Sequence, residues 1–362
     1  MKILVTLNSS NFGGIERTVL DLAKGLSQNH EVYIICPSGD LIEDYKKYAK
    51  VYQYKKVTKV DFKYIFYLAK ILKREKIDVL HSNDPRITFN SLIAGFLAKT
   101  KVKISHTHTP ISSWQISVKS KKINIFLNTL IVNLLSDYEI CLTEVIRKQK
   151  EQEGIDPQKL FVIGNCLDED FKNEVIKLNS QVLKPHKYFE FLCVSRFSVE
   201  KNQEMLIEAF YELSKLYKDV KLVLVGKGPM LLHSKDLVSK FKIEDKVDFI
   251  NEIEDSEKVA IMKSSDCFVF PTLAEGFGLV MIEAMTTSKY VIVSDLDVLK
   301  EVSNNQLIYF QSNNKLDLLK KMLEVYEGKI SSSYEENKSF VFQKYSFDNY
   351  IKSYEKIYSS KL

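Results

Sequence analysis

The chain has 362 residues, of which 45% are hydrophobic and 27% charged, so it is long enough to build two domains with full cores. This composition is typical of a globular protein and argues against disorder. Residues 1–180 carry 27 Lys and Arg against 20 Asp and Glu, whereas residues 181–362 carry 25 against 27, so the net charge of +5 comes from the first half. A basic half suits an anionic acceptor or an acidic membrane surface, and it lacks the dense arginine clusters of a nucleic-acid-binding protein.

The cysteines and the N-terminal run indicate a cytoplasmic protein. Five cysteines are scattered singly, with no Cys-x-x-Cys pair, which is typical of buried, reduced thiols. The apolar run 3–7 is too short for a signal peptide, because polar residues 8–11 end it, and we expect it to form the first strand. We expect no segment to span a membrane.

A glycine loop follows this first strand. Gly13 and Gly14 lie in the loop, and apolar residues then recur at helical spacing over 19–26. Strand, glycine loop and helix form the geometry of a phosphate or sugar site at the edge of a sheet. The loop is neither Gly-x-Gly-x-x-Gly nor a P-loop, so a dinucleotide or ATP site has little support, and a plain tight turn is the alternative.

Short β-branched runs alternate with helical stretches through the rest of the first half. We interpret the runs at 32–36, 79–81 and 102–106 as strands, and the alternation predicts a doubly wound parallel sheet. Before the second of these runs, residues 55–76 combine eight Lys and Arg with aromatic and aliphatic residues. A basic amphipathic helix of this kind suits a membrane interface, and a surface helix with its aromatic side chains in the core is the alternative.

Two histidines, His106 and His108, stand at the end of the strand 102–106. A metal site needs a third ligand, and the sequence offers no partner at suitable spacing, so we expect no metal there. For His106 we expect the role of an ordinary hydrogen-bonded strand histidine.

A polar stretch that contains Pro185 is interpreted as a linker between two domains. The predicted division is a first domain over 1–171, a linker over 172–186 and a second domain over 187–344.

The second domain opens with a strand, 189–194, and a loop that carries Arg196 and Lys201. Two cations five residues apart across a strand-to-helix loop can converge on one point and bind a diphosphate. Two unrelated surface cations are the alternative.

Residues 271–285 place two carboxylates in an apolar segment punctuated by glycines. The preceding run 267–270 is typical of a buried parallel strand, Gly276 and Gly278 flank a phenylalanine, and helical composition begins at about Gly278. The N-terminus of a helix placed there would offer unpaired N–H groups to an anion such as a diphosphate.

The two carboxylates of this segment belong to Glu275 and Glu283. Glu283 lies about one turn inside the predicted helix among apolar neighbours, where hydrogen bonds from ribose hydroxyls would offset the cost of its burial. Glu275 lies in the loop, where it can meet a second hydroxylated group. The alternative is that both are solvated surface residues.

The Glu-x7-Glu pattern of Glu275 and Glu283, with Arg196 and Lys201, resembles the signature of the retaining glycosyltransferases of family four. The resemblance covers the whole chain. It implies the GT-B fold, an α/β architecture of two Rossmann-like, doubly wound parallel-sheet domains that face a cleft, with a closing helix over 345–362 that returns to the first domain. Cys166 and Thr109 depart from the usual pattern, where glycine and aspartate are common.

The resemblance also implies roles for individual residues. The residues implied in catalysis are Arg196, Lys201, Glu275 and His108. The residues implied in donor binding are Gly14, Arg196, Lys201, Gly226, Ile250, Asn251, Glu275, Gly276, Phe277, Gly278, Leu279, Val280 and Glu283. The residues implied on the acceptor side are Gly13, Gly14, Glu16, His108 and Asn165.

We therefore expect a retaining hexosyltransferase that uses a nucleotide diphosphate sugar, most simply a UDP-sugar, without a metal or other cofactor. The implied acceptor is a glycan or lipid-linked glycan of a bacterial-type surface polysaccharide, such as capsule or lipopolysaccharide. The enzyme would be cytoplasmic and peripheral on the anionic inner face of the membrane, with no nucleic-acid partner. The alternatives are a GT-B UDP-sugar 2-epimerase and a non-catalytic UDP-sugar-binding subunit.

Overall fold

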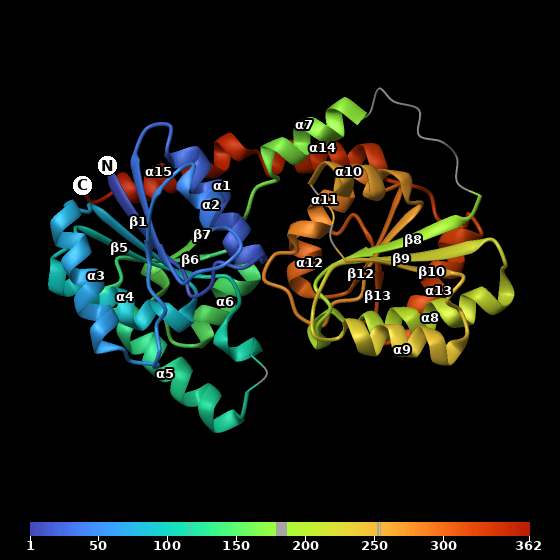
Figure 1. The fold of residues 1–362 in the computed structure, drawn as a ribbon, viewed down its shortest axis with the longest axis horizontal. Coiled ribbons are helices and arrows are strands. Elements are labelled where there is room, and N and C mark those ends of the chain that lie inside the picture. The colour runs from blue at the N-terminus through green and yellow to red at the C-terminus, as the bar shows by residue number, and fades with distance from the viewer. Residues whose placement is uncertain (115, 179–186, 252, 254) are drawn as a thin grey trace. The chain divides into compact units, whose positions relative to one another are not determined.

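The computed structural model describes residues 1–114, 116–178, 187–251, 253 and 255–362, and these divide into two compact units (Figure 1). Unit 1 comprises Met1–Cys166 and Phe347–Leu362, and unit 2 comprises Leu167–Ser346. Each unit is built on one parallel sheet flanked by helices, which confirms the predicted α/β class with two doubly wound domains.

The sheet of unit 1 has seven strands in the order β3-β2-β1-β4-β5-β6-β7. β1 and β4 are neighbours, with Ile3 opposite Val79, so the winding reverses between them and creates a topological switch point. The strands predicted at 3–7, 32–36, 79–81 and 102–106 are confirmed. The strands are β1 (Lys2–Thr6), β2 (Glu31–Cys36), β3 (Lys50–Gln53), β4 (Val79–Asn83), β5 (Val102–Thr107), β6 (Tyr138–Cys141) and β7 (Leu160–Val162).

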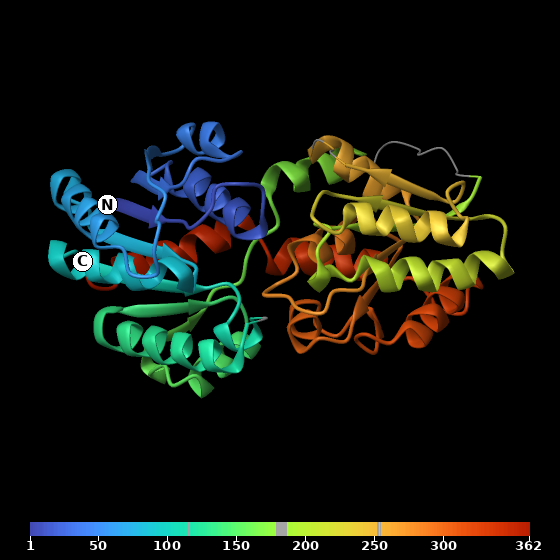
Figure 2. The ribbon, with the colours of Figure 1, turned by 60° about the horizontal axis from the view of Figure 1, so that its bottom comes forward.

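Helices cover both faces of this sheet, with α1 and α15 on one face and α3, α4 and α5 on the other (Figures 1 and 2). Alternate residues of β1 point to opposite faces, so Ile3 and Val5 join the core beneath α1 and α15, whereas Leu4 joins the core beneath α3 and α4. The helices are α1 (Gly14–Leu26), α2 (Ile42–Lys46), α3 (Phe62–Glu75), α4 (Pro85–Ala98), α5 (Val118–Leu135), α6 (Glu144–Gln152) and α15 (Phe347–Ser359).

The sheet of unit 2 has six strands in the order β10-β9-β8-β11-β12-β13. Its switch point lies between β8 and β11, which pair in parallel although β9 and β10 separate them in sequence. The strands are β8 (Phe189–Val194), β9 (Val220–Val225), β10 (Val247–Ile250), β11 (Cys267–Phe270), β12 (Tyr290–Ser294) and β13 (Ile308–Phe310). The helices are α7 (Glu169–Leu178), α8 (Gln203–Leu216), α9 (Leu231–Phe241), α10 (Asp255–Ser264), α11 (Leu279–Thr287), α12 (Asp297–Val302), α13 (Lys315–Tyr326) and α14 (Tyr334–Lys344).

The predicted linker needs correction at its start. Residues 172–178 continue α7, because Phe171, Val175 and Leu178 form a buried apolar stripe at helical spacing that outweighs the polar residues between them. α7 contacts α10 and α11 and belongs to unit 2, which begins at Leu167. The remainder of the predicted linker, 179–186, lies outside the described residues.

Two further sequence predictions concern thiols and the basic segment. All five cysteines are buried thiols, as predicted. The segment 55–76 becomes helical only at Phe62, after Asp61 caps the helix by accepting from the Tyr64 N–H. Its aromatic side chains differ in burial, since Tyr64 is buried whereas Phe62 and Phe66 are exposed. Within the described residues, every helix is too short or too polar to cross a bilayer.

Candidate active site

The loops that follow β8 and β11 meet at the switch point of unit 2. The Leu273 N–H donates to the main-chain oxygen of Glu200 at 2.7 Å, and the Thr272 hydroxyl donates to the same oxygen at 3.1 Å. The first loop carries Arg196 and Lys201, and the second carries Glu275. Main-chain hydrogen bonding therefore fixes the two predicted loops against each other at the carboxyl edge of the sheet, where open α/β sheets bind their ligands.

Lys201 and Glu275 form an ion pair across these loops. Their side chains are 20% and 13% exposed, so the pair is mostly shielded from water. The Lys201 Nζ also lies 5.1 Å from the ring centroid of Phe270, the last residue of β11, in cation–π geometry. The structure thus brings together two predicted residues 74 positions apart and holds the cation in a defined place.

Arg196 has a different environment. Its guanidinium pairs with Glu200 at 2.8 Å within the same loop, and its side chain is 66% exposed. The two cations therefore pair with different carboxylates, and their convergence on one diphosphate stays a prediction. The loop itself is held by Gln203, whose Nε2 donates to the Arg196 main-chain oxygen at 2.9 Å.

Gly278 shapes the start of α11. It caps the helix with φ at +86°, and a Cβ there would lie 2.8 Å from Leu299 Cδ2, so a side chain would be strained and crowded. The predicted helix start at about Gly278 is confirmed. The side chain of Phe277 is buried edge-on against Tyr345, so the predicted donor contact of this residue would fall to its main chain.

Glu283 lies on α11, one turn inside the helix, and it pairs with Lys258 of α10 at 2.6 Å. The side chains of Lys258 and Glu283 are 20% and 15% exposed. Sequence reasoning found Glu283 but missed Lys258. No periodicity or motif links two residues on successive helices, so the sequence carries no signal for this pair.

The exits of β9 and β10 adjoin the same edge. The Gly226 N–H donates to the Ile250 main-chain oxygen at 2.9 Å, and the Ser195 N–H donates to the Val225 oxygen at 3.0 Å. Gly226 has φ at +141°, and a Cβ there would collide with the main-chain oxygen of Ser195. The predicted residues Gly226, Ile250 and Asn251 therefore lie beside the loop of Arg196.

In unit 1, the glycine loop after β1 leads into α1. Gly13 precedes the helix in an extended conformation, and a Cβ there would collide with the carboxylate of Glu16. Nothing lies within 4 Å of a Cβ built on Gly14. Burial raises the pKa of Glu16 above its ordinary value. The loop follows β1, which borders the switch point of this sheet, so its position is that of a ligand-binding loop.

His108 lies near the same edge, after β5, and it is buried. Its Nε2 is 3.0 Å from Asn83 Oδ1, and its ring stacks on His106 at 4.0 Å between centroids. Burial lowers the pKa of His108 to about 3, so the imidazole is neutral at physiological pH. A neutral ring supplies no positive charge to a bound ligand.

His106 continues this chain of contacts into the core. Its Nδ1 is 3.3 Å from His81 Nε2, and His81 Nδ1 is 2.6 Å from the Tyr358 hydroxyl of α15. His106 is therefore a hydrogen-bonded strand histidine, as expected. Asn165, predicted on the acceptor side, is buried after β7, and its Oδ1 accepts no hydrogen bond from the described residues.

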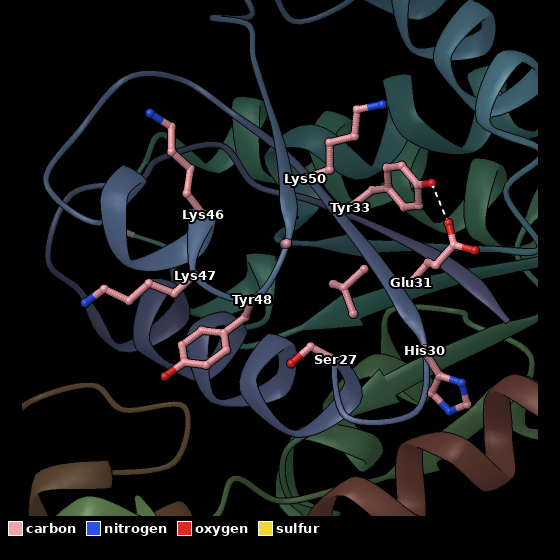
Figure 3. A pocket seen from close by; sticks show the side chains of 10 residues that line it. Ser27, His30, Glu31, Tyr33, Lys46, Lys47, Tyr48 and Lys50 are labelled. Atoms are coloured by element: carbon pink, nitrogen blue, oxygen red, sulfur yellow. Dashed lines mark hydrogen bonds between the residues drawn. The ribbon is translucent and has the colours of Figure 1, made fainter.

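A pocket elsewhere in unit 1 contains none of the predicted residues (Figure 3). It lies where β2 and β3 begin, at the sheet edge opposite the glycine loop, and on one side of it Tyr33 donates to Glu31 of the same strand at 3.0 Å. Lys46, Lys47 and Lys50 line it but pair with nearby carboxylates, so we assign it no role.

Two family models match the chain. The model described as Glycosyltransferase Family 4 matches residues 12–171, and the model described as Glycosyl transferases group 1 matches residues 174–341. The first contains the glycine loop and His108, and the second contains both glutamates and both cations.

Individual proteins are also similar over most of the chain. An uncharacterized glycosyltransferase of Methanocaldococcus jannaschii is 26% identical over 80% of this chain and 77% of its own length. The capsular polysaccharide biosynthesis glycosyltransferase CapH of Staphylococcus aureus is 23% identical over 89% of this chain and 88% of its own. The crystal structure of Anabaena HepE in complex with UDP-glucose has a TM-score of 0.83 at 19% identity and covers 99% of this chain and 100% of that chain.

Proposed function

This chain belongs to the glycosyltransferases of family four, and we propose that it is a retaining hexosyltransferase that uses a UDP-sugar. The acceptor we propose is a glycan or lipid-linked glycan of a bacterial-type surface polysaccharide. The observation that carries the proposal is the meeting of Lys201, Glu275 and the start of α11 at the switch point of unit 2. The similarity to a capsular polysaccharide glycosyltransferase supports the pathway, and the UDP-glucose complex of a protein with the same fold supports the donor.

The chemistry that this site suits is departure of a diphosphate. The bond between the sugar's anomeric carbon and the diphosphate oxygen breaks, a bond to the acceptor oxygen forms on the same face, and the acceptor's proton passes to the departing phosphate. Negative charge grows on the diphosphate as its bond breaks. Lys201, Arg196 and the main-chain N–H groups of 276–280 are the groups that would stabilise that charge.

The test of the function is a screen of radiolabelled UDP- and GDP-sugars, with and without glycan acceptors. We expect UDP release from one UDP-sugar, slow by hydrolysis and faster with an acceptor, and an α-linked product from an α-linked donor. A product of inverted configuration would contradict the retaining mechanism. Conversion of UDP-GlcNAc to UDP-ManNAc without acceptor would show that the protein is an epimerase and not a transferase.

Transfer should not depend on a divalent metal, because Arg196 and Lys201 already supply positive charge for the diphosphate. We expect the rate in EDTA to equal the rate in added Mn²⁺ or Mg²⁺. Loss of transfer in EDTA that Mn²⁺ restores would contradict this prediction, and the same chelator with an excess of Mg²⁺ controls for direct inhibition.

The membrane partner we propose meets unit 1 on the face formed by α3, α4 and α5. Apolar side chains stand exposed on these helices, and Phe126 on α5 is 66% exposed. Four of the exposed apolar positions on α5 recur every three or four residues and form one stripe. The members of this apolar face are Phe62, Phe66, Phe96, Ile123, Phe126, Leu130 and Leu134.

Cations border the apolar face. Lys59 in the basic segment donates to Asn124 of α5 at 3.4 Å, so the segment lies beside the apolar stripe. A groove on α3 and α4 combines Phe66 and Leu97 with Lys70, Lys73 and Arg74. An apolar centre with a basic border is complementary to an anionic lipid bilayer, which takes up aromatic side chains and attracts each cation by about 1 kcal/mol.

Removal of four cations from this border should release the protein from anionic vesicles. We expect replacement of Lys55, Lys56, Lys59 and Lys63 by Gln to abolish most flotation with phosphatidylserine vesicles, while transfer to a soluble acceptor analogue is unchanged. Four exposed lysines of unit 2, Lys215, Lys218, Lys240 and Lys242, replaced by Gln form the matched control. A parent protein that does not float at low salt, or a control that loses binding equally, would contradict the proposed surface.

A further inference from the structure

Lys258 is a charged residue near the donor site that the sequence motifs do not include. Its Nζ lies 2.6 Å from Glu283 Oε2, and both side chains are mostly shielded from water. Glu283 is the carboxylate that the sequence pattern predicts to accept hydrogen bonds from the ribose of the nucleotide. Lys258 therefore contacts a donor-site group from the side of α10, one helix away in sequence.

Two elements besides α10 fix the position of this lysine. Glu283 comes from α11, and the Nζ also lies 5.4 Å from the ring centroid of Phe171 in α7. α7 contacts both α10 and α11. A cation held between a carboxylate and an aromatic face has few alternative positions, so its partner carboxylate is restrained as well.

This restraint matters because Glu283 is mostly shielded from water. The Glu283 side chain is only 15% exposed, and a carboxylate so shielded from water is costly to keep charged without a cation. A carboxylate has about four lone-pair sites, so it can accept from lysine and from two ribose hydroxyls together. The lysine and the nucleotide need not compete.

We propose that Lys258 is a positioning residue for the donor: it holds Glu283 oriented so that this carboxylate accepts hydrogen bonds from the ribose hydroxyls. Lys258 acts through Glu283 and does not itself contact the nucleotide. The inference rests on the proposed function, since it assumes that unit 2 binds UDP. It adds a residue outside the Glu-x7-Glu motif on which nucleotide affinity depends.

The experiment compares UDP with 2′,3′-dideoxy-UDP by calorimetry, because the second ligand lacks the hydroxyls that Glu283 would bind. We expect Lys258→Met to raise the Kd for UDP about tenfold, which corresponds to the loss of one hydrogen bond to a charged group. The Kd for dideoxy-UDP should be unchanged. Lys258→Arg should retain the parent ratio of the two Kd values. Lys263→Met, on the same helix, is the matched control and should behave as the parent.

The possible outcomes distinguish a failure of this inference from a failure of the proposed function. If Lys258→Met weakens the binding of both ligands equally, the ion pair is purely structural. If the binding of both ligands is unchanged, Glu283 needs no partner. Either result overturns this inference but not the proposed function. In a Glu283→Gln background, Lys258→Met should add no further loss for UDP, and an additional tenfold loss would also overturn it. A parent protein that binds neither UDP nor a UDP-sugar overturns the proposed function itself.

Discussion

Lys201→Ala should lower kcat by about a hundredfold to a thousandfold while it changes the Kd for the donor far less. The reason is that Lys201 is held in place by Glu275 and Phe270 before the substrate arrives, so its charge acts chiefly when charge develops on the leaving diphosphate. Such preorganised groups are worth about 2–4 kcal/mol of barrier. Single-turnover rates at saturating donor would measure the effect.

Arg196→Ala should also lower turnover more than donor affinity. Because the Arg196 side chain is 66% exposed and pairs with Glu200 of its own loop, we expect a smaller loss than for Lys201→Ala. Lys215→Ala provides the control, since this exposed lysine pairs with Glu212 on the outer part of α8. A parent rate in either Arg196→Ala or Lys201→Ala would contradict its assignment to the leaving group, and thermal melting would show that each variant is folded.

The sequence predicted the architecture because the signals for it are local. The run Cys267–Phe270 is apolar without interruption, and it forms a strand whose residues are all buried. Gly278 permits the backbone conformation from which α11 starts. The site residues follow such strands, so finding the strands located Glu275, Arg196 and Gly226 at the sheet edge as well.

The parts that could not be predicted are individual pairings between side chains. Lys258 and Glu283 lie on successive helices, and no periodicity links them. Arg196 and Glu200 are close in sequence, but their spacing does not show whether the guanidinium pairs with Glu200 or with a shared anion. The linker prediction is wrong for residues 172–178 of α7 because the buried apolar stripe of this helix has only three members, and the first of them, Phe171, precedes the polar stretch. The exposed apolar stripe on α5 could not be told from core by spacing, since both have the same period.

The second large predicted effect is that substitutions of the two glutamates impair the binding of different ligands. Glu283→Ala should weaken binding of free UDP by about tenfold to a hundredfold, because it removes the charged acceptor for the ribose hydroxyls and leaves Lys258 without its carboxylate. Glu283→Gln keeps the shape of the side chain and should still lose most of this affinity. Calorimetry with UDP measures both.

Glu275→Ala should instead leave the Kd for UDP within about twofold and impair only the sugar-bearing donor. Glu275 lies in the loop before α11, so its removal takes away an acceptor for sugar hydroxyls, whereas Phe270 still holds Lys201 near the diphosphate. The ratio of the Kd values for UDP-sugar and UDP therefore rises for Glu275→Ala and stays near the parent value for Glu283→Ala. Equal losses of UDP affinity in the two variants would refute separate roles, and Glu212→Ala on α8 controls for the loss of a paired carboxylate.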